Sequence, residues 1–212
     1  MTDTDLGDKR TAFRFCTYNC NGLGDFKKRK DVFDFLREKQ CSIYFLQETH
    51  LLHNSENFIR SCWGYTTFLA GCDTNKNGVA ILFNNNFEYK VHNVIRDPHG
   101  CYILLDIELL EKRMTLVNVY GPSSGDHPEF FDTVCTHIDH IGNDIIVAAG
   151  DWNVVLNMKL DSRNYQSTVN RPRTRKKIFD VMVQYELIDV FRNMYPTKRK
   201  YSWRKFNSIK QG

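Results

Sequence analysis

Apolar and polar positions alternate along the chain in short runs separated by turn residues, which predicts many strands with a few helices between them. Residues 13–19 and 42–48 are apolar runs typical of strands, and residues 28–39 between them carry apolar side chains at helical spacing. The side chains expected on the buried face of this helix are Val32, Phe33, Phe35 and Leu36. The pattern therefore predicts one βαβ unit near the N-terminus.

Five further runs read as short strands, and the Gly, Asn, Asp and Pro residues in the links between them favour antiparallel pairing. These runs are residues 64–71, 78–84, 89–95, 101–109 and 113–122. A helix over 128–141 precedes an apolar run that ends at Asp151, residues 174–196 read mostly as helix, and a last strand is expected over 201–206. Such a mixture predicts an α/β fold in which two sheets pack face to face with helices outside.

Composition fits this picture and narrows the setting of the chain. The 212 residues include 42% hydrophobic and 25% charged side chains, as in one globular domain, so we assign 1–12 to a polar N-terminal segment and 13–212 to the domain. No apolar run approaches the roughly 18 residues of a membrane span, and the polar N-terminus does not resemble a secretion signal. Seven cysteines without C-x-x-C spacing disfavour disulfides and zinc, and they indicate a reducing compartment, nucleus or cytoplasm.

Basic residues concentrate toward the C-terminus. Residues 1–158 hold 15 basic and 21 acidic side chains, a net charge of −6, whereas residues 159–212 hold 14 and 4, a net charge of +10. The runs RPRTRKK (171–177) and KRK (198–200) dominate this excess and suit a polyanion such as nucleic acid. A solvated basic helix face explains the charge equally well.

Polar side chains follow three of the predicted strands at comparable points. Asn19 ends the first strand, Glu48 ends the second, and Asp151 and Asn153 end a later one, with Gly150 read as a turn. If these strands are neighbours, their polar ends meet at one edge of the sheet. Carboxylate and amide oxygens at such an edge suit Mg²⁺ or Mn²⁺ better than zinc.

Each of these residues also fits a structural role when it is taken alone. Asn19, and the pair Asp151 and Asn153, are common turn residues. Glu48 could cap a loop or pair with a surface lysine, and Tyr120 could be an ordinary half-buried ring. Only the order of the motifs along the chain separates the two interpretations.

Five motifs occur in a specific order: TYNCNGL, LQETH, NVYGP, GDWN and YSW. In this order the sequence resembles the endonuclease/exonuclease/phosphatase superfamily, the metal-dependent phosphodiesterases that include DNase I and abasic-site repair enzymes of the exonuclease III type. The stretches LDSR and ELIDVFRNMYP make it most similar to the N-terminal endonuclease domain of LINE-type (non-LTR) retrotransposon polyproteins. The resemblance runs from about Phe13 to Trp203 and implies a four-layer DNase I-like α/β sandwich.

The resemblance implies a role for each matched residue. Glu48 would bind Mg²⁺ or Mn²⁺, and Asn19 would contribute to the metal environment. Asp151 would orient or activate the attacking water, Asn153 would bind the scissile phosphate, and Tyr120 would direct its hydroxyl toward that phosphate. Arg163 and Ser202 match DNA-backbone contacts, so the expected partner is double-stranded DNA. The implied product is a nick with a 3′-hydroxyl that primes reverse transcription.

The sequence departs from the family pattern after YSW. Members that it resembles continue with a strand carrying a catalytic aspartate and with a Ser-Asp-His motif, and no residue up to Gly212 matches either. None of the seven histidines takes the place of the motif's histidine, and we expect them in surface or loop positions. We therefore expect a fold that lacks the last strands and a chain that binds DNA weakly and nicks it poorly or not at all. Such a chain is either a fragment of a longer polyprotein or pairs its open sheet edge with a second chain.

Three other functions remain open at this point. A domesticated derivative would keep the fold as a non-catalytic DNA-binding or protein-interaction module. An abasic-site repair nuclease, or a phosphatase acting on inositol lipids or sphingomyelin, would keep the chemistry and change the substrate. Comparing the cleavage of intact plasmid with that of an abasic duplex separates repair from retrotransposition.

Overall fold

The computed structural model describes residues 12–74, 76–84, 87–162 and 171–201. The chain divides into a first compact unit, Met1–Tyr120 with Ile141–Asp151, and a second, Gly121–His140 with Trp152–Gly212. The strand predicted over 201–206 and nearly all of the predicted N-terminal segment lie outside the described residues. Both of these assignments, and that of one domain over 13–212, stay predictions.

The first sheet of the first unit has the strand order β1-β2-β4-β3. Its strands are β1 (Phe15–Asn19), β2 (Ile43–Gln47), β3 (Thr67–Ala70) and β4 (Val79–Phe83). β1 and β2 are parallel and are joined by the helix α1 (Phe26–Glu38), so the predicted βαβ unit is confirmed. Asp25 caps the helix by accepting a hydrogen bond from the backbone nitrogen of Lys28 at 2.7 Å.

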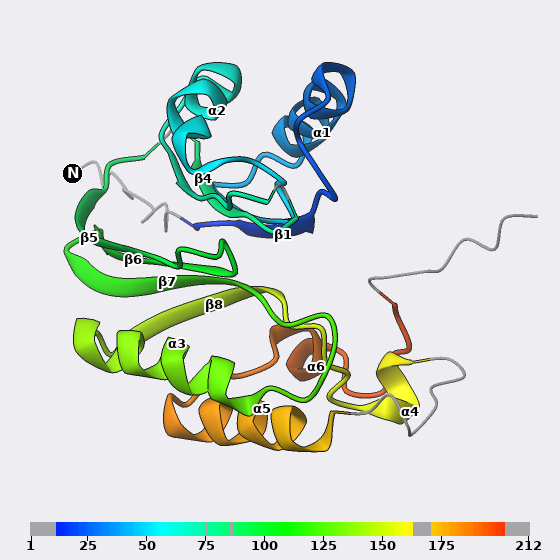
Figure 1. The fold of residues 1–212 in the computed structure, drawn as a ribbon. Coiled ribbons are helices and arrows are strands. Elements are labelled where there is room, and N and C mark those ends of the chain that lie inside the picture. The colour runs from blue at the N-terminus through cyan, green and yellow to red at the C-terminus, as the bar shows by residue number, and fades with distance from the viewer. Residues whose placement is uncertain (1–11, 75, 85–86, 163–170, 202–212) are drawn as a thin grey trace, which may run out of the picture. The chain divides into compact units, whose positions relative to one another are not determined.

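Two helices cover the outer face of this sheet, α1 and α2 (Glu56–Trp63), the second preceded by the short 3₁₀ turn His53–Ser55 (Figure 1). The sequence pattern did not predict α2. Its apolar residues lie at helical spacing, but the helix has only eight residues, of which Ile59 and Trp63 are buried, and so short a segment does not establish a helical period.

The buried face of α1 differs from the prediction at one residue. Val32, Phe33 and Leu36 are buried as expected, whereas Phe35 is 38% exposed. Phe35 lies two residues after Phe33 and so points from a different side of the helix, where its ring contacts Tyr18. Including Phe35 in the core was therefore wrong.

The second sheet of the first unit has the order β5-β6-β7-β8. Its strands are β5 (Lys90–Arg96), β6 (Tyr102–Leu109), β7 (Lys112–Tyr120) and β8 (Ile145–Asp151). The pairs β5–β6 and β6–β7 are antiparallel, as the short links predicted, and β7–β8 is parallel. Both sheets are therefore mixed.

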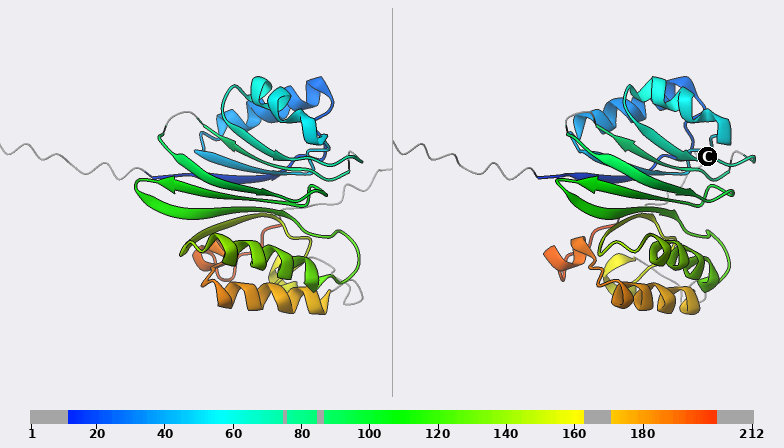
Figure 2. Two further views of the ribbon diagram at one scale, coloured as in Figure 1. Left: turned by 60° about the vertical axis from the view of Figure 1, so that its left-hand side comes forward. Right: turned by 90° about the vertical axis from the view of Figure 1, so that its left-hand side faces the viewer.

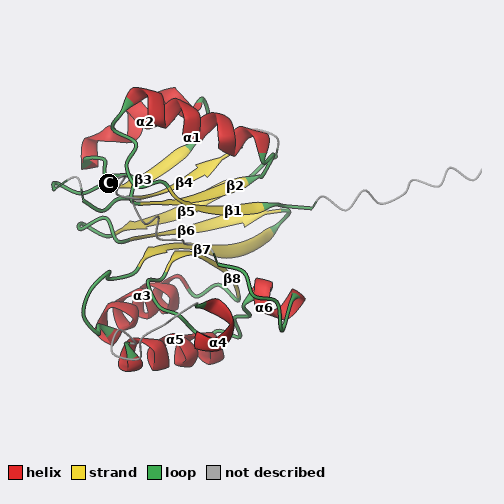
Figure 3. Ribbon diagram, turned by 90° about the vertical axis from the view of Figure 1, so that its right-hand side faces the viewer, coloured by secondary structure: helices red, strands yellow, loops and turns green. Residues whose placement is uncertain are grey.

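The two sheets pack face to face through side chains at alternate strand positions (Figure 3). The largest contributors are Ile43 and Phe45 of β2, Ile81 and Phe83 of β4, Ile103 and Leu105 of β6, and Leu116 of β7. The remaining positions of β2 and β4, including Tyr44 and Leu82, face the helices. Strand β2 is thus buried on both sides, which explains its unbroken apolar run. The α/β class with two packed mixed sheets and helices is confirmed.

The second unit is helical in its described part. It contains α3 (Pro128–Ile141), α4 (Met158–Asp161), α5 (Pro172–Gln184) and α6 (Val190–Met194), and α3 lies beside α5 (Figure 2). Two contacts join α3 and α5: Lys177 Nζ lies 2.5 Å from Asp132, and the Tyr185 hydroxyl donates to Asp139 at 2.8 Å. The predicted helix over 128–141 is confirmed.

The segment predicted to be mostly helical, 174–196, is mostly helical, but it consists of two helices, α5 and α6, with a break between them. The chain leaves the helical conformation after Gln184, and Glu186 has a positive φ of 52°, a conformation that no α-helix contains. A separate short helix, α6, starts where Asp189 accepts a hydrogen bond from the backbone nitrogen of Arg192. The sequence pattern did not reveal this break, because the residue with the positive φ is Glu186 rather than a glycine, and no proline lies between the two helices.

The setting of the chain is described by three observations. No helix in the described part of the chain is long and apolar enough to cross a membrane. All seven cysteines are free thiols. Nothing among the described residues supports a second chain at a sheet edge.

Candidate active site

Strand alternation places three of the predicted site residues on the faces of the two sheets that meet each other. Phe15 and Thr17 of β1 contact Phe45 and Gln47, so Asn19, the next residue of that face, also points between the sheets. On β8, Val147 and Ala149 pack in the inter-sheet core, and Asp151 follows them on the same face. The parallel register of β7 and β8 pairs Tyr120 with Asp151.

The predicted convergence has a different origin from the one expected. The sequence argument required three neighbouring strands in one sheet, whereas β1 and β2 belong to the first sheet and β8 belongs to the second. Face-to-face packing, rather than strand pairing, brings their carboxyl ends together. The predicted proximity holds, and the assumed strand order is wrong.

Asn19, Glu48 and Asp151 form a cluster that we call the acidic edge. The amide nitrogen Nδ2 of Asn19 donates a hydrogen bond to Glu48 Oε1 at 2.8 Å and a second to Asp151 Oδ2 at 3.1 Å. The amide oxygen of Asn19 accepts a hydrogen bond from the backbone nitrogen of Asn21 at 3.1 Å. Asn19 therefore orients both carboxylates, which lie 29 and 132 residues away in the sequence.

The backbone at Glu48 is held in an uncommon conformation. Glu48 has a φ of 51° and His50 has a φ of 53°, in the left-handed region that non-glycine residues rarely occupy. Neighbouring loops fix this segment: Gly22 N donates to the Glu48 carbonyl at 2.6 Å, and Thr49 N donates to the Gly78 carbonyl at 2.9 Å. Such conformations persist where the surroundings over-determine them, and they cluster at functional sites.

A buried amide pair lies directly behind the acidic edge. Asn118 of β7 is fully buried, and its Nδ2 donates to the carbonyls of Leu46 and Ala80 in the first sheet at 2.9 and 2.8 Å. Gln47 Nε2 donates to Asn118 Oδ1 at 2.7 Å. Because these bonds span both sheets next to Glu48 and Tyr120, they fix the position of one sheet relative to the other at this end.

Gly150 is a strand residue rather than the predicted turn. It pairs with Val119 inside β8, and its φ is 143°. A Cβ at this position would lie 2.0 Å from the Val119 carbonyl oxygen, so only glycine allows β7 and β8 to approach. The strand then continues through Asp151, which is how the carboxylate reaches the inter-sheet face.

His50 is a site residue that the sequence analysis missed. It lies in a loop, as expected for the histidines, but its Nε2 is 3.5 Å from Glu48 Oε2. Its position two residues after Glu48 was the available signal. Because the two residues are so near in the sequence, that spacing could have suggested proximity to the carboxylate.

The donor set of the acidic edge fits a hard divalent cation. Glu48 is 21% exposed, so its carboxylate is accessible from solvent. The described residues contain no group of three or more His, Cys, Asp or Glu side chains that could hold a metal. A site with few protein carboxylates suits Mg²⁺, which keeps several of its waters. Burial raises the pKa of the nearby Cys20 thiol to about 12, so Cys20 stays neutral and offers no thiolate ligand.

Asn153 belongs to the second unit and is also in the left-handed region, with a φ of 52°. Its Nδ2 donates to the carbonyl of Gly121 at 2.8 Å, which ties the GDWN motif to the end of the NVYGP motif. Arg163 and Ser202 lie outside the described residues, so their DNA contacts stay predictions.

Much of the basic run at residues 171–177 bonds within the second unit. Arg171 donates to the carbonyls of Asn153, Pro122 and Ser123, and Arg175 donates twice to the carbonyl of Leu156. Lys176 pairs with Asp180, and Lys177 with Asp132. The exposed Lys176–Asp180 pair fits the interpretation as a solvated helix face, whereas the carbonyl contacts of Arg171 and Arg175 follow from neither interpretation.

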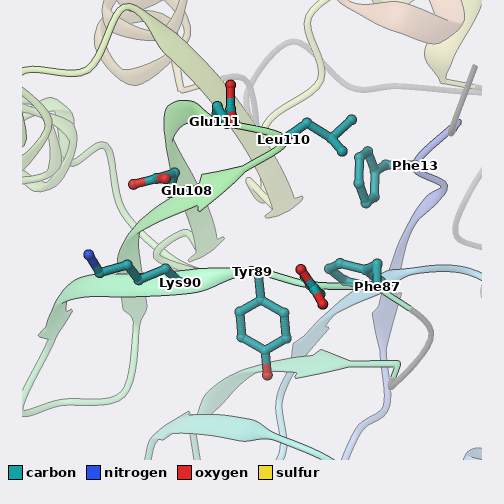
Figure 4. A pocket seen from close by; sticks show the side chains of 8 residues that line it. Phe13, Phe87, Tyr89, Lys90, Glu108, Leu110 and Glu111 are labelled. Carbon is teal, nitrogen blue, oxygen red and sulfur yellow. The ribbon is translucent and has the colours of Figure 1, made fainter.

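A pocket of about 630 Å³, whose lining side chains Figure 4 shows, lies in the first unit. It lies at the opposite end of β7 from Tyr120. Its lining includes Phe13, Phe87, Leu110 and Glu111. Because Leu110 and Glu111 form the turn before β7, nine residues of strand separate this pocket from the acidic edge. It is therefore not the predicted active site.

The chain is similar to known proteins in sequence and in fold. The chain is 26% identical over 187 residues to the "Transposon TX1 uncharacterized 149 kDa protein" of Xenopus laevis, covering 87% of this chain but only 14% of that protein. The fold is similar to that of the AP endonuclease LMAP from Leishmania major, with a TM-score of 0.71, 18% identity and coverage of 88% of this chain and 70% of the other. An AP endonuclease from Archaeoglobus fulgidus is also similar in fold, with a TM-score of 0.70 and 19% identity. The match covers 94% of this chain and 80% of the other.

A sequence model of one family matches the larger part of the chain, residues 16–165. This span includes four of the five motifs and all three members of the acidic edge. The chain belongs to the Endonuclease/Exonuclease/phosphatase family.

Proposed function

We propose that this chain is a metal-dependent DNA endonuclease domain of a non-LTR retrotransposon, which nicks one strand of its target and leaves a 3′-hydroxyl primer. The observation that carries the proposal is the double hydrogen bond of Asn19 to Glu48 and Asp151. It joins two carboxylates from different sheets at the edge where the family motifs end. A surface pair or a simple turn does not require that arrangement.

The chemistry follows from the side chains of the acidic edge. Glu48 would hold Mg²⁺ or Mn²⁺, with Asn19 in its surroundings, and the ion would neutralise charge on the phosphoryl group and the leaving oxygen. Asp151 orients a water and accepts its proton, and Asn19 keeps this carboxylate directed toward the inter-sheet face. The Tyr120 hydroxyl and the Asn153 carboxamide receive the scissile phosphate. In this proposal Arg163 and Ser202 would contact the DNA backbone.

The assignment to a retrotransposon rests on the transposon relative. This chain spans about one seventh of that relative's length, so the activity of the whole relative is not carried over. The motif order supports a retrotransposon domain further. The chain's partner in this proposal is double-stranded DNA, and the reaction precedes reverse transcription.

A second candidate function is abasic-site repair, because the similar solved structures are AP endonucleases. The chemistry at the acidic edge is the same in both functions. Only the substrate differs: an intact duplex for the transposon nuclease and an abasic duplex for the repair enzyme.

The test compares both substrates under single-turnover conditions with excess protein. Wild type, Glu48→Ala and the matched control Glu38→Ala are incubated with supercoiled plasmid and with an abasic duplex, each with Mg²⁺ and with a chelator. We expect slow Mg²⁺-dependent nicking of plasmid that Glu48→Ala abolishes and Glu38→Ala leaves unchanged, because Glu38 is exposed on α1. Cleavage of the abasic duplex alone would favour repair. Nicking that persists in Glu48→Ala would reject the proposed site.

A further inference from the structure

The Arg171 side chain donates hydrogen bonds to three backbone carbonyls in the loops of the second unit around Pro122 and Asn153. Its Nη1 donates to the Asn153 carbonyl at 2.7 Å and also to the Pro122 carbonyl, and its Nη2 donates to the Ser123 carbonyl. These three acceptors come from two segments separated by 30 residues of sequence. One guanidinium, with its rigid fork of donors, therefore fastens the segment after NVYG to the segment after GDW.

The two fastened segments also hold the Asn153 side chain. Asn153 Nδ2 donates to the Gly121 carbonyl at 2.8 Å, and Gly121 precedes Pro122 directly. Gly121 packs closely against Trp152, since a Cβ on it would lie 2.5 Å from the Trp152 carbonyl oxygen. The position of Gly121 therefore sets the direction of the Asn153 carboxamide, and Arg171 sets the position of both backbones.

The start of α5 keeps Arg171 in place. Arg171 is the residue before Pro172, the first residue of the helix, whose ring fixes the helical φ. Asp126 accepts hydrogen bonds from the backbone nitrogen and the hydroxyl of Thr174, both at 2.7 Å. These bonds attach the loop after Ser123 to the first turn of α5, so the helix start and the loop it contacts are one assembly.

We infer that Arg171 is a positioning residue for Asn153: it fixes the left-handed backbone and the carboxamide direction of Asn153 without contacting the phosphate itself. The inference rests on the proposed function, because that function gives Asn153 its role. A nearby arginine in a basic run is ordinarily read as a phosphate contact, and these hydrogen bonds assign this one to the protein's own carbonyls. Its charge then matters less than its donor geometry.

The experiment uses the 212-residue chain with Arg171→Gln, Arg171→Lys and the matched control Arg173→Gln. Arg173 is exposed in the same run, so its substitution removes an equal charge without breaking the carbonyl contacts. Arg171→Gln is expected to lower the single-turnover nicking rate about 10- to 100-fold, because small misplacements of a phosphate ligand have effects of this size. The Kd for DNA should change less than about twofold. Arg171→Lys should recover part of the rate, and Arg173→Gln should leave it near wild type.

Hydrogen exchange gives a readout that does not depend on activity. Arg171→Gln should speed amide exchange in residues 121–123 and 153–156, while exchange in the first unit and the melting temperature of Arg171→Lys stay close to wild type. Equal exchange in wild type and Arg171→Gln would overturn the inference. Because this arm needs no nicking, it decides the role of Arg171 in the loops even if Glu48→Ala shows that the proposed function is wrong.

A double variant with Asn153→Ala tests whether Arg171 acts through Asn153. The effect of Arg171→Gln should largely disappear in the Asn153→Ala background, since a positioning residue has nothing left to position. An undiminished loss of rate there would overturn the inference. The inference would also be overturned if Arg171→Gln weakened DNA binding and reduced the slope of log K against log salt concentration by about one, because both changes indicate a direct phosphate contact.

Discussion

The acidic edge of the first unit and the Asn153 segment of the second unit are held in place by different means. Glu48, Asn19 and Asp151 stand at the ends of paired strands, and buried hydrogen bonds between two sheets fix the strands behind them. Asn153 lies in a loop whose conformation depends on carbonyl contacts with one arginine. The difference teaches that strand ends, with loop contacts to the Glu48 segment, can position the proposed metal ligand, whereas the proposed phosphate ligand in a loop depends on a dedicated side chain.

Removal of a carboxylate from the acidic edge should have the largest effect. Glu48→Ala and Asp151→Asn should each lower the nicking rate about 100- to 1,000-fold, because preorganised groups at developing charge contribute on that scale. Thermal unfolding should change little, since both carboxylates are accessible rather than core groups. A plasmid-nicking assay with a parallel melting curve checks both expectations. A rate within threefold of wild type in either variant contradicts the role of the acidic edge.

Gly150→Ala should break the strand that carries Asp151. The new Cβ would collide with the Val119 carbonyl oxygen at a φ of 143°, so we expect a loss of more than about 3 kcal/mol of unfolding free energy. Gly24→Ala is the matched control, because a Cβ there meets no atom within 4 Å. Its effect should stay within about 0.5 kcal/mol. Urea titrations of both variants provide the measurement, and equal stabilities would show that β7 and β8 do not require a glycine.

Asn118→Ala should weaken the connection between the sheets. The substitution removes one hydrogen bond of Gln47, which keeps its bonds to Thr17 and Phe45, and removes the side-chain donor of two buried carbonyls, which costs about 1–3 kcal/mol. Because Asn118 lies behind the acidic edge, nicking should also decrease, unlike in the Gly24→Ala control. Denaturant titration with a nicking assay tests this. A stability equal to wild type would mean that the amide pair does not fix the sheets.

A smaller, pH-dependent effect on stability is expected from substitution of Asp106, which lies in β6 of the second sheet, away from the acidic edge. Burial opposes its charge, but hydrogen bonds from Arg113 and Asn143 outweigh this and hold the pKa of Asp106 below its ordinary value. The ionised Asp106 carboxylate therefore contributes to the free energy of unfolding at pH values above its unfolded-state pKa of 3.8. This contribution is lost as the pH falls through the lower pKa of the folded state. Asp106→Asn should lower stability by about 1 kcal/mol at pH 7. The difference from wild type should shrink below about pH 4 in urea titrations across pH, and a pH-independent difference would contradict this account.

The sequence predicted the first region better than the second for a physical reason. Apolar periodicity reports burial, so it located the strands, α1 and α3, and with them the ends at which Asn19, Glu48 and Asp151 stand. It did not identify Gly150 as a strand residue, because a glycine after an apolar run is equally consistent with a turn and with two strands in close contact. It also gave the wrong strand neighbours, because the periodicity of a strand does not show which sheet the strand belongs to.

Contacts between side chains and the backbone of loops could not be predicted from the sequence. Nothing in RPRTRKK distinguishes the arginine that binds three carbonyls from the exposed one two residues later. The left-handed conformations of Glu48, His50 and Asn153 were likewise unpredicted. Asn and His adopt positive φ more often than most residues, but they do so in only a small minority of positions, and Glu has no such preference. The motif order suggested what these residues do, and the hydrogen bonds indicate how they are held.

The central claim is that Glu48, with Asn19 and Asp151 beside it, holds a divalent cation at the meeting of the two sheets. Crystals of the chain grown with Mn²⁺ test it most directly, through an anomalous difference map. We predict a peak within coordination distance of the Glu48 carboxylate that is lost in Glu48→Ala crystals. A peak elsewhere in the molecule, or one that persists without the Glu48 carboxylate, would contradict the claim.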